Sequence, residues 1–114
     1  MNKDIVNKIG KLITDKKIDE AQLELSKLGQ QFYKDPEYLY LRSQTFYLNK
    51  IYYLAIDTLL ISLEFEKTDK VYNLIAEIYK VLENEELSKN FFNVNIREKT
   101  ANTLKDQLSG IYRK

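Results

Sequence analysis

Cysteine and histidine, two side chains that often carry out chemistry in proteins, are both absent from these 114 residues. Their absence excludes disulfides, thiolate nucleophiles, the usual Cys/His zinc sites and the commonest general base. The nearest thing to a carboxylate cluster is Glu83, Glu85 and Glu86, which stands where one expected helix ends and the next begins. Acids at that position stabilise the positive end of a helix dipole, so we interpret the cluster as a cap. The chain also lacks a glycine-rich phosphate loop and a serine nucleophile elbow. We therefore expect no enzymatic activity, no catalytic residues, and no metal or cofactor.

Nine tyrosines are the other residues that could serve a binding function, because aromatic rings can stack on nucleic-acid bases. Most of them follow the spacing of a helical core, and no basic groove accompanies them. Lys and Arg together number 18 and Asp and Glu together 17, which leaves a net charge of +1. Nucleic-acid-binding domains usually present a strongly basic face, so the charge balance argues against nucleic acid as a partner.

The composition, 44% apolar and 31% charged, is that of a folded globular protein. A chain of this length can bury its own core, so we expect a single domain over residues 1–114. The most apolar stretch, residues 51–65, contains Asp57 and Thr58 and is too short to cross a bilayer. The first twelve residues include an acid and no unbroken apolar run, unlike a signal peptide. We expect a cytoplasmic protein without membrane insertion.

Only three glycines and one proline interrupt the chain, and its periodic segments are long. This pattern predicts an all-α fold of helices joined by short turns. We expect helices over about 3–16, 19–33, 36–49, 51–66, 69–83, 85–97 and 99–112. Four residues at or just before the starts of these runs are candidate N-caps: Asp19, Asp35, Thr68 and Asn84. The last two helices could be one, because neither Pro nor Gly separates them.

The strongest signal in the sequence is a repeat. Four columns of matching residue types recur at spacings of 34 and then 33 residues: Ile5, Leu39 and Tyr72; Leu12, Phe46 and Tyr79; Ala21, Ala55 and Ser88; Leu25, Leu59 and Phe92. The small residue in the second helix of each pair lets two backbones lie close together. The large residue near the end of the first helix fills the space between neighbours. A period near 34 residues with two helices per unit is typical of tetratricopeptide repeats.

On these columns the chain resembles tetratricopeptide-repeat proteins over about residues 2–98. The best match is the pattern of Tyr72, Ile75, Ala76 and Tyr79. The chain departs from the family at Arg42 and Lys8, where a leucine is usual, and at Ile9, where a small residue is usual.

The resemblance implies a fold as well as a repeat. Three helix-turn-helix units, at about 2–35, 36–68 and 69–98, would stack into a right-handed α-α superhelix, or solenoid. Residues 99–112 carry apolar side chains at helical spacing and would form a C-terminal helix that caps the open end. Their apolar positions are Ala101, Leu104, Leu108 and Ile111.

In this family the first helix of each repeat lines a concave groove that holds a peptide. Transferred position by position, the pattern gives Tyr40, Gln44, Tyr47, Asn73, Glu77 and Lys80, preceded in the first repeat by Val6, Gly10 and Ile13. Tyr and Gln combine contact area with hydrogen bonding, which suits peptide recognition. The resemblance thus implies a scaffold that binds a protein or peptide. The alternative is that these are ordinary solvated helix positions.

The segment 51–66 carries more apolar surface than one helix face requires. One face would supply the core: Tyr52, Ala55, Ile56, Leu59 and Leu63. A second stripe runs at helical spacing on another side: Leu54, Thr58, Ile61 and Phe65. Either another part of this chain covers the second stripe, or another chain does. The alternative function is accordingly a self-assembling structural subunit, or a small secretion-type chaperone, that forms a homo-oligomer through Leu54, Ile61 and Phe65.

Overall fold

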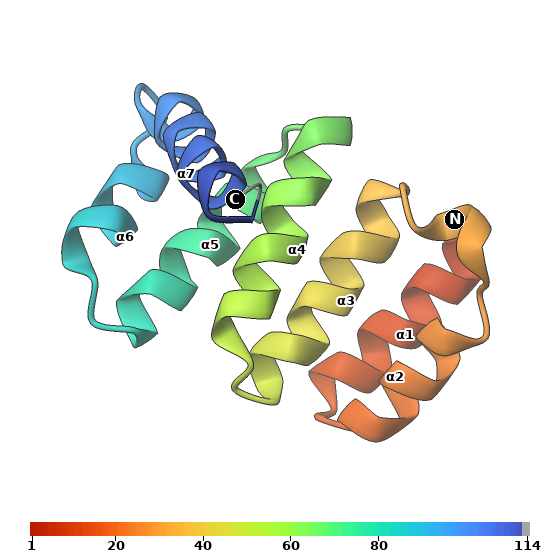
Figure 1. The fold of residues 1–114 in the computed structure, drawn as a ribbon. Helices are drawn as coiled ribbons and strands as arrows, with labels where there is room; N and C mark the ends of the chain where they lie inside the picture. Colours follow the sequence, from red (N-terminus) through yellow and green to blue (C-terminus); the bar gives the residue numbers. More distant parts are fainter. Residues whose placement is uncertain (113–114) are drawn as a thin grey trace. The chain divides into compact units, whose positions relative to one another are not determined.

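A computed structural model describes residues 1–112 of the chain, with side chains as far as Leu108. These residues form seven α-helices and one short 3-10 helix and contain no strand, so the described chain is all-α, as the sequence predicts (Figure 1). The elements are α1 (Lys3–Thr14), α2 (Ile18–Ser26), η1 (Gln30–Phe32), α3 (Pro36–Leu48), α4 (Tyr52–Phe65), α5 (Asp69–Val81), α6 (Glu85–Phe92) and α7 (Arg97–Tyr112).

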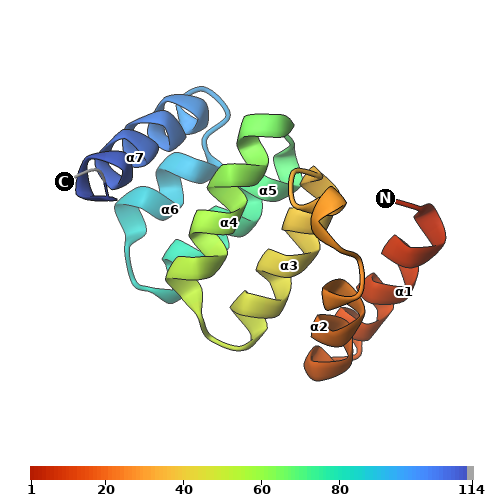
Figure 2. The same ribbon diagram turned by 45° about the vertical axis from the view of Figure 1, so that its right-hand side comes forward.

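The helices fall into two compact units. The first, Met1–Lys67, contains α1 to α4, and the second begins at Thr68 and contains α5 to α7. In the first unit α3 packs against α1, α2 and α4, and α3 and α4 run antiparallel, side by side (Figure 2). In the second unit α6 packs against both α5 and α7. The superhelical stacking of the repeats stays a prediction.

Three helical hairpins, α1–α2, α3–α4 and α5–α6, close with the same turn. One residue in each turn takes the left-handed conformation: Lys16 at φ +60°, Lys50 at +63° and Glu83 at +63°. The N–H of the next residue donates back across the turn to a helix carbonyl, that of Leu12, Phe46 or Tyr79, at 2.8, 2.9 and 2.9 Å respectively. This is the Schellman pattern, which satisfies carbonyls at a helix end. The turns are 34 and 33 residues apart, so the period in the sequence is also a period in the backbone.

The small residues of the repeat lie inside the hairpins. Ala21 and Ala55 are fully buried, and Ser88 is 6% exposed. The Ser88 hydroxyl donates a hydrogen bond to the Ala76 carbonyl at 2.8 Å, so its burial leaves no unsatisfied polar atom. Each hairpin therefore brings its helices together at a compact side chain.

The fourth column of the repeat does not keep the same pattern of burial in the third hairpin. Leu25 and Leu59 are buried as expected, but Phe92 is 47% exposed and Phe91 is fully buried. The Phe91 ring stacks on that of Tyr79, with the ring centroids 5.8 Å apart and the planes 11° apart. Successive helix residues point about 100° apart, so burial of Phe91 turns Phe92 outwards.

Two helices end at least five residues earlier than the sequence predicts. The expected helix over 19–33 ends at Ser26, because Gly29 follows with a φ of +76° and only a 3-10 turn comes after it. The expected helix over 85–97 ends at Phe92. The Asn93 side chain there accepts from the N–H of Asn95 at 2.9 Å, which closes a turn before α7 begins at Arg97. Residues 85–112 are therefore two helices.

Two of the four expected N-caps are confirmed. The side chains of Asp35 and Asn84 accept backbone N–H groups of the first turn at 2.8 and 3.1 Å. Of the other two, Asp19 is wrong, and Thr68 is confirmed in its position but makes no capping hydrogen bond. The Schellman turn carries the chain into α2 early, so its N-cap is Lys17 and Asp19 already lies in the first turn.

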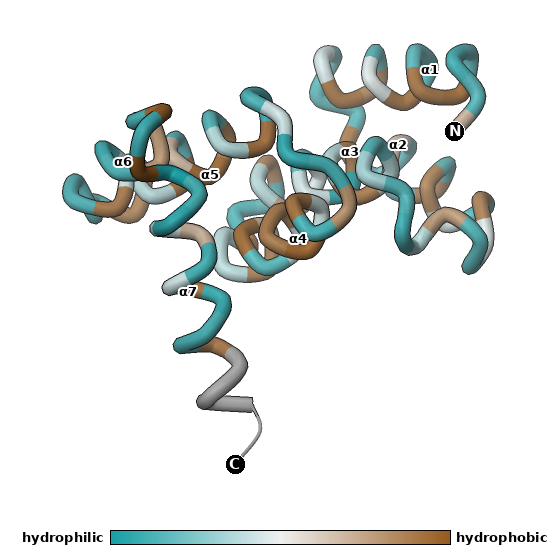
Figure 3. Tube along the Cα trace, turned by 90° about the horizontal axis from the view of Figure 1, so that it is seen from above, coloured by the Kyte–Doolittle hydropathy of each residue, from teal (hydrophilic) through white to brown (hydrophobic). Residues whose placement is uncertain are grey.

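Apolar residues are distributed differently on the individual helices. On α1 the hydrophobic side is confined to one stripe, whereas α4 is hydrophobic on several sides (Figure 3). Even so, none of the helices in residues 1–112 combines the length and the hydropathy needed to cross a membrane.

Candidate functional site

Three of the expected groove residues share one face of α3. Tyr40, Gln44 and Tyr47 follow one another at i, i+4 and i+7, and each is half-buried. The Tyr47 ring lies 5.9 Å from the ring of Tyr52, at the turn into α4, which fixes that end of the row. We call Tyr40, Gln44 and Tyr47 the polar-aromatic row.

The other three expected groove residues lie in the second unit. Asn73, Glu77 and Lys80 are all exposed on α5, whose other sides are buried. Their exposure is compatible with contact to a partner. That they complete one groove with the polar-aromatic row stays a prediction.

The expected contribution of α1 to the groove is wrong at Ile13. Ile13 is only 7% exposed and belongs to the core of the first unit, together with Ile9 one turn earlier. Val6 packs partly against the same core. The single apolar stripe of α1 is buried by this packing, so α1 has no second apolar face that a partner could contact. Gly10 is half-buried, and a Cβ built on it would meet no atom within 4 Å.

The second apolar stripe on α4 is exposed at three of its four expected positions. Leu54, Ile61 and Phe65 are each 45% exposed. Thr58 is the exception, because it is 7% exposed and its hydroxyl donates to the Leu54 carbonyl at 2.8 Å. Leu54, Ile61 and Phe65 are called the outer stripe below.

A hollow that sequence reasoning missed lies beside the outer stripe. Its volume is about 180 Å³, and α3 and α4 supply most of its walls. A second hollow of about 290 Å³ lies between α2 and α3. Four side chains line both hollows: Tyr33, Tyr38, Arg42 and Phe46.

Arg42 stands among these aromatic rings. Its Nη1 donates to the Tyr38 hydroxyl at 2.9 Å, and its guanidinium carbon lies 5.5 Å from the centroid of Phe46 and 6.0 Å from that of Tyr38. These distances allow a cation–π attraction. No carboxylate within residues 1–112 forms an ion pair with Arg42. The one sequence signal for this site was the arginine itself, at a position where the resembled family has leucine.

An acid lies on the opposite flank of the outer stripe. Asp57 comes three residues after Leu54, which places it about 60° round α4 on the side away from Thr58. Thr58 lines the hollow that holds Arg42, so Arg42 and Asp57 flank the stripe from opposite sides. Burial raises the pKa of the Asp57 carboxyl above its ordinary value. Asp57 also has no ion-pair or hydrogen-bond partner in the part of the chain that the structure describes.

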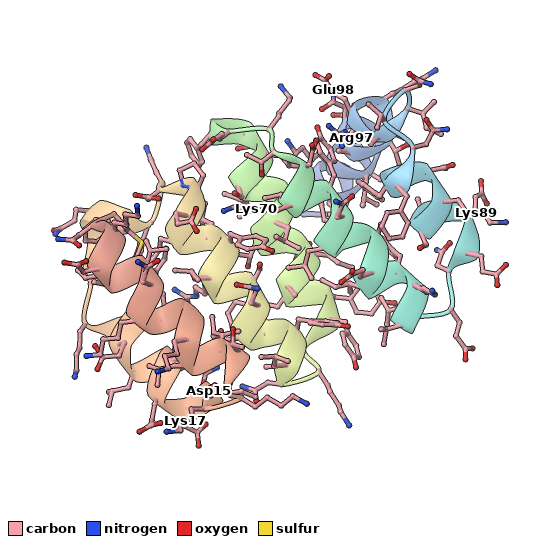
Figure 4. The ribbon with its side chains drawn as sticks, turned by 180° about the vertical axis from the view of Figure 1, so that it is seen from behind. Asp15, Lys17, Lys70, Lys89, Arg97 and Glu98 are labelled. Carbon is pink, nitrogen blue, oxygen red and sulfur yellow. The ribbon has the colours of Figure 1, made fainter. Side chains whose placement is uncertain are left out.

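The second unit also places an arginine over a tyrosine, but there the charge is paired. The guanidinium carbon of Arg97 lies 4.4 Å from the Tyr72 ring centroid, and its Nη2 contacts Asp69 Oδ1 at 2.6 Å. Burial, helped by the charge of Glu98, raises the Tyr72 pKa, and Arg97 opposes that shift. Arg97 and Glu98 open α7 (Figure 4). This cluster joins the start of α7 to α5, and its arginine is already paired with an acid.

Two further observations bear on what the site can be. Among the described residues, no group of three or more acidic side chains is placed to hold a metal ion. The chain was also compared with protein-family models, with curated proteins and with solved structures, and nothing in any of the three comparisons matches it. Its function is therefore inferred from the polar-aromatic row and from the outer stripe with its charged flanks.

Proposed function

We propose that this chain is a protein-interaction module of tetratricopeptide-like helical hairpins, which binds a peptide segment of a partner along the polar-aromatic row. One observation carries the proposal: Tyr40, Gln44 and Tyr47 stand half-exposed on a single face of a helix whose buried residues lie on its other sides. Asn73, Glu77 and Lys80 are exposed on α5 of the second unit and are further candidates for contact with a partner.

The rigidity of α3 supports this proposal. The helix packs against α1, α2 and α4, and Ser43 and Thr45 within it are buried. Their hydroxyls donate to backbone carbonyls of α3 itself, at 2.6 and 2.7 Å, so they need no outside partner. Side chains on such a helix are already positioned before binding, which lowers the entropy lost when a complex forms.

The chemistry of the row also suits a peptide ligand. A tyrosine offers a large amphipathic surface with few rotatable bonds, so little side-chain entropy is lost on contact. A glutamine amide can both donate to and accept from a peptide backbone. The combination of two rings with one amide between them would hold an extended segment by stacking and by hydrogen bonds.

The proposal is tested by a double substitution, Tyr40→Ala with Tyr47→Ala. The full chain is used as bait in a lysate of the native host, and captured proteins are identified by mass spectrometry. Binding of each captured partner, once purified, is then measured by calorimetry. We expect the double variant to bind at least tenfold more weakly than the unsubstituted chain.

The matched control is Tyr53→Ala, which removes a tyrosine that is 70% exposed on α4 and outside the row. The control should bind as the unsubstituted chain does. Gln44→Ala provides a milder change in the row, and circular dichroism verifies that each variant is folded. Equal affinity of the double variant and the control for the purified partner would refute the proposal.

A second candidate function, assembly into a homo-oligomer, is favoured by a different observation. Three large apolar side chains of α4 remain 45% exposed each, in a row. Contiguous exposed apolar surface of this kind often marks a contact with another chain.

A further inference from the structure

We propose that the outer stripe is the centre of a symmetric homodimer interface, in which Arg42 of each copy pairs with Asp57 of the other copy. The interface lies on a different face from the polar-aromatic row, so it is independent of the proposed peptide binding.

The apolar part of this interface is continuous along α4. Leu54, Ile61 and Phe65 stand at i, i+7 and i+11, so they form a row along one side of the helix. The hollow of about 180 Å³ beside the row is lined by Leu54 and Ile61 as well as by Phe46 and Tyr33. A row of side chains next to a hollow gives a second copy both a ridge to bury and a recess to fill. Removal of this surface from water drives association.

The two charged flanks are what identify the occupant as a second copy. Arg42 is cationic on one side of the stripe, Asp57 is anionic on the other, and neither has an ion-pair partner among the described residues. A surface with an unpaired base on one flank and an unpaired acid on the other is complementary to itself. A second copy would supply both missing counter-charges at once.

Symmetry decides how the two copies meet. A two-fold axis that runs along α4 in the contact plane exchanges the flanks, so the Arg42 flank of each copy faces the Asp57 flank of the other. Arg42 lies level with Leu54 to Ile61, because these residues line its hollow, and Asp57 falls within the same stretch. An axis perpendicular to α4 in that plane would instead place like charges together. The charges therefore select the arrangement in which the two α4 helices point the same way.

The mass of the full chain in solution tests the dimer. Sedimentation equilibrium over a range of concentrations should give a mass that rises from 13.6 kDa towards twice that value. Ile61→Glu should hold the mass at 13.6 kDa throughout, because it places a charge in the apolar centre. The matched control is Leu23→Glu, which makes the same kind of change at a leucine that is 56% exposed on α2. The control should dimerise like the unsubstituted chain.

Charge reversal tests the pairing itself. Arg42→Glu alone and Asp57→Lys alone should each raise the dimer dissociation constant at least tenfold, because like charges then face each other on both flanks. An equimolar mixture of the two variants should restore the dimer, since every flank of the mixed dimer then has an acid opposite a base. The double variant with both reversals should dimerise for the same reason. A fold damaged by either substitution would not recover in this way.

Two outcomes would overturn the proposal. One is an unsubstituted chain that stays monomeric at the highest concentration. If Ile61→Glu also abolished capture of another protein by that monomer, the other protein would be the occupant of the outer stripe. The other is a dimer that both charge reversals leave unchanged, or that their mixture fails to restore. Neither outcome depends on Tyr40 or Tyr47, so the peptide-binding proposal stands or falls separately.

Discussion

The helix α4 has two apolar faces that the structure treats differently. Ala55 and Leu59 on the inner face are fully buried, and Ile56 and Leu63 beside them are 2% exposed. The three residues of the outer stripe are each 45% exposed. Both faces consist of the same kinds of side chain, so hydropathy alone cannot distinguish them. A residue is assigned to the core by what surrounds its helix, and an apolar face left without neighbours is available for another chain.

The largest expected effect of a substitution separates these two faces directly. Leu59→Ala should lower the free energy of unfolding by about 2–5 kcal/mol, because it leaves a cavity in a closely packed interior. Ile61→Ala should lower the stability of the monomer by less than about 1 kcal/mol, because half of that side chain is already in water. Urea denaturation at a protein concentration below the dimer range measures both values.

The comparison would break if the two substitutions were equally destabilising in the monomer. That result would mean that the outer stripe is covered by a part of this same chain. The inner face would still belong to the core, but the outer stripe would not be available as an interface.

A smaller effect is expected at Arg42. Arg42→Ala removes the hydrogen bond to Tyr38, the attraction to the Phe46 ring and the packing of the aliphatic stem. We expect a loss of about 1 kcal/mol in monomer stability, together with loss of the dimer. Arg42→Lys keeps the charge but not the planar guanidinium, so it should recover part of the dimer affinity and little of the monomer stability. Thermal unfolding and sedimentation of both variants would separate the two roles.

Much of the fold could be predicted because the repeat constrains both the contacts between helices and the positions of the turns. The small residues Ala21, Ala55 and Ser88 mark where two helices approach, and the turns recur with the same period. The register nevertheless failed at Phe92, because either of two adjacent phenylalanines can fill a buried position. The structure places Phe91 there, stacked on a tyrosine. Only the three-dimensional packing distinguishes the two residues.

The helix ends were predicted less well, for local reasons. Gly29 ends α2 early through a positive φ that a hydrophobic pattern does not register, since Phe32 beyond it still packs against the core. Asn93 separates α6 from α7 through a turn of its own side chain, although neither Pro nor Gly lies between the helices. Short polar side chains that bond to their own backbone can thus interrupt a helix as glycine does.

The candidate sites also divide into features that the sequence predicts and features that only the three-dimensional packing reveals. The outer stripe could be located from helical spacing, because a period of 3.6 residues fixes which side chains share a face. The polar-aromatic row was located from the family resemblance. The hollow around Arg42 could not be located, because it depends on side chains from three elements: Tyr33 follows η1, Arg42 lies on α3 and Leu54 on α4. Ile13 was misplaced because the family pattern ignores how this chain fills its own first hairpin.

The smallest expected effect is that of Asp57→Asn on the free energy of unfolding. It separates the contribution of this residue to monomer stability from its contribution to the dimer. Burial raises the pKa of Asp57 in the folded monomer, so the charged carboxylate destabilises the monomer at neutral pH. That penalty develops as the pH rises from the ordinary value for an aspartate, about 3.9, through the raised folded value. Asp57→Asn, in the Ile61→Glu background that holds the chain monomeric, should therefore raise the free energy of unfolding at pH 7 by up to about 0.5 kcal/mol. The gain should vanish as the pH falls below the carboxyl range.

In the chain without the Ile61 substitution, Asp57→Asn should weaken the dimer, because it removes the counter-charge of Arg42. The same change would thus stabilise one copy and weaken the contact between two, which is expected of a residue kept for binding rather than for folding. Denaturation curves across the acid range and sedimentation at pH 7 measure the two effects. Loss of monomer stability at pH 7 would instead show that Asp57 has a partner within its own copy, and Arg42 would then lack its counter-charge in the second copy.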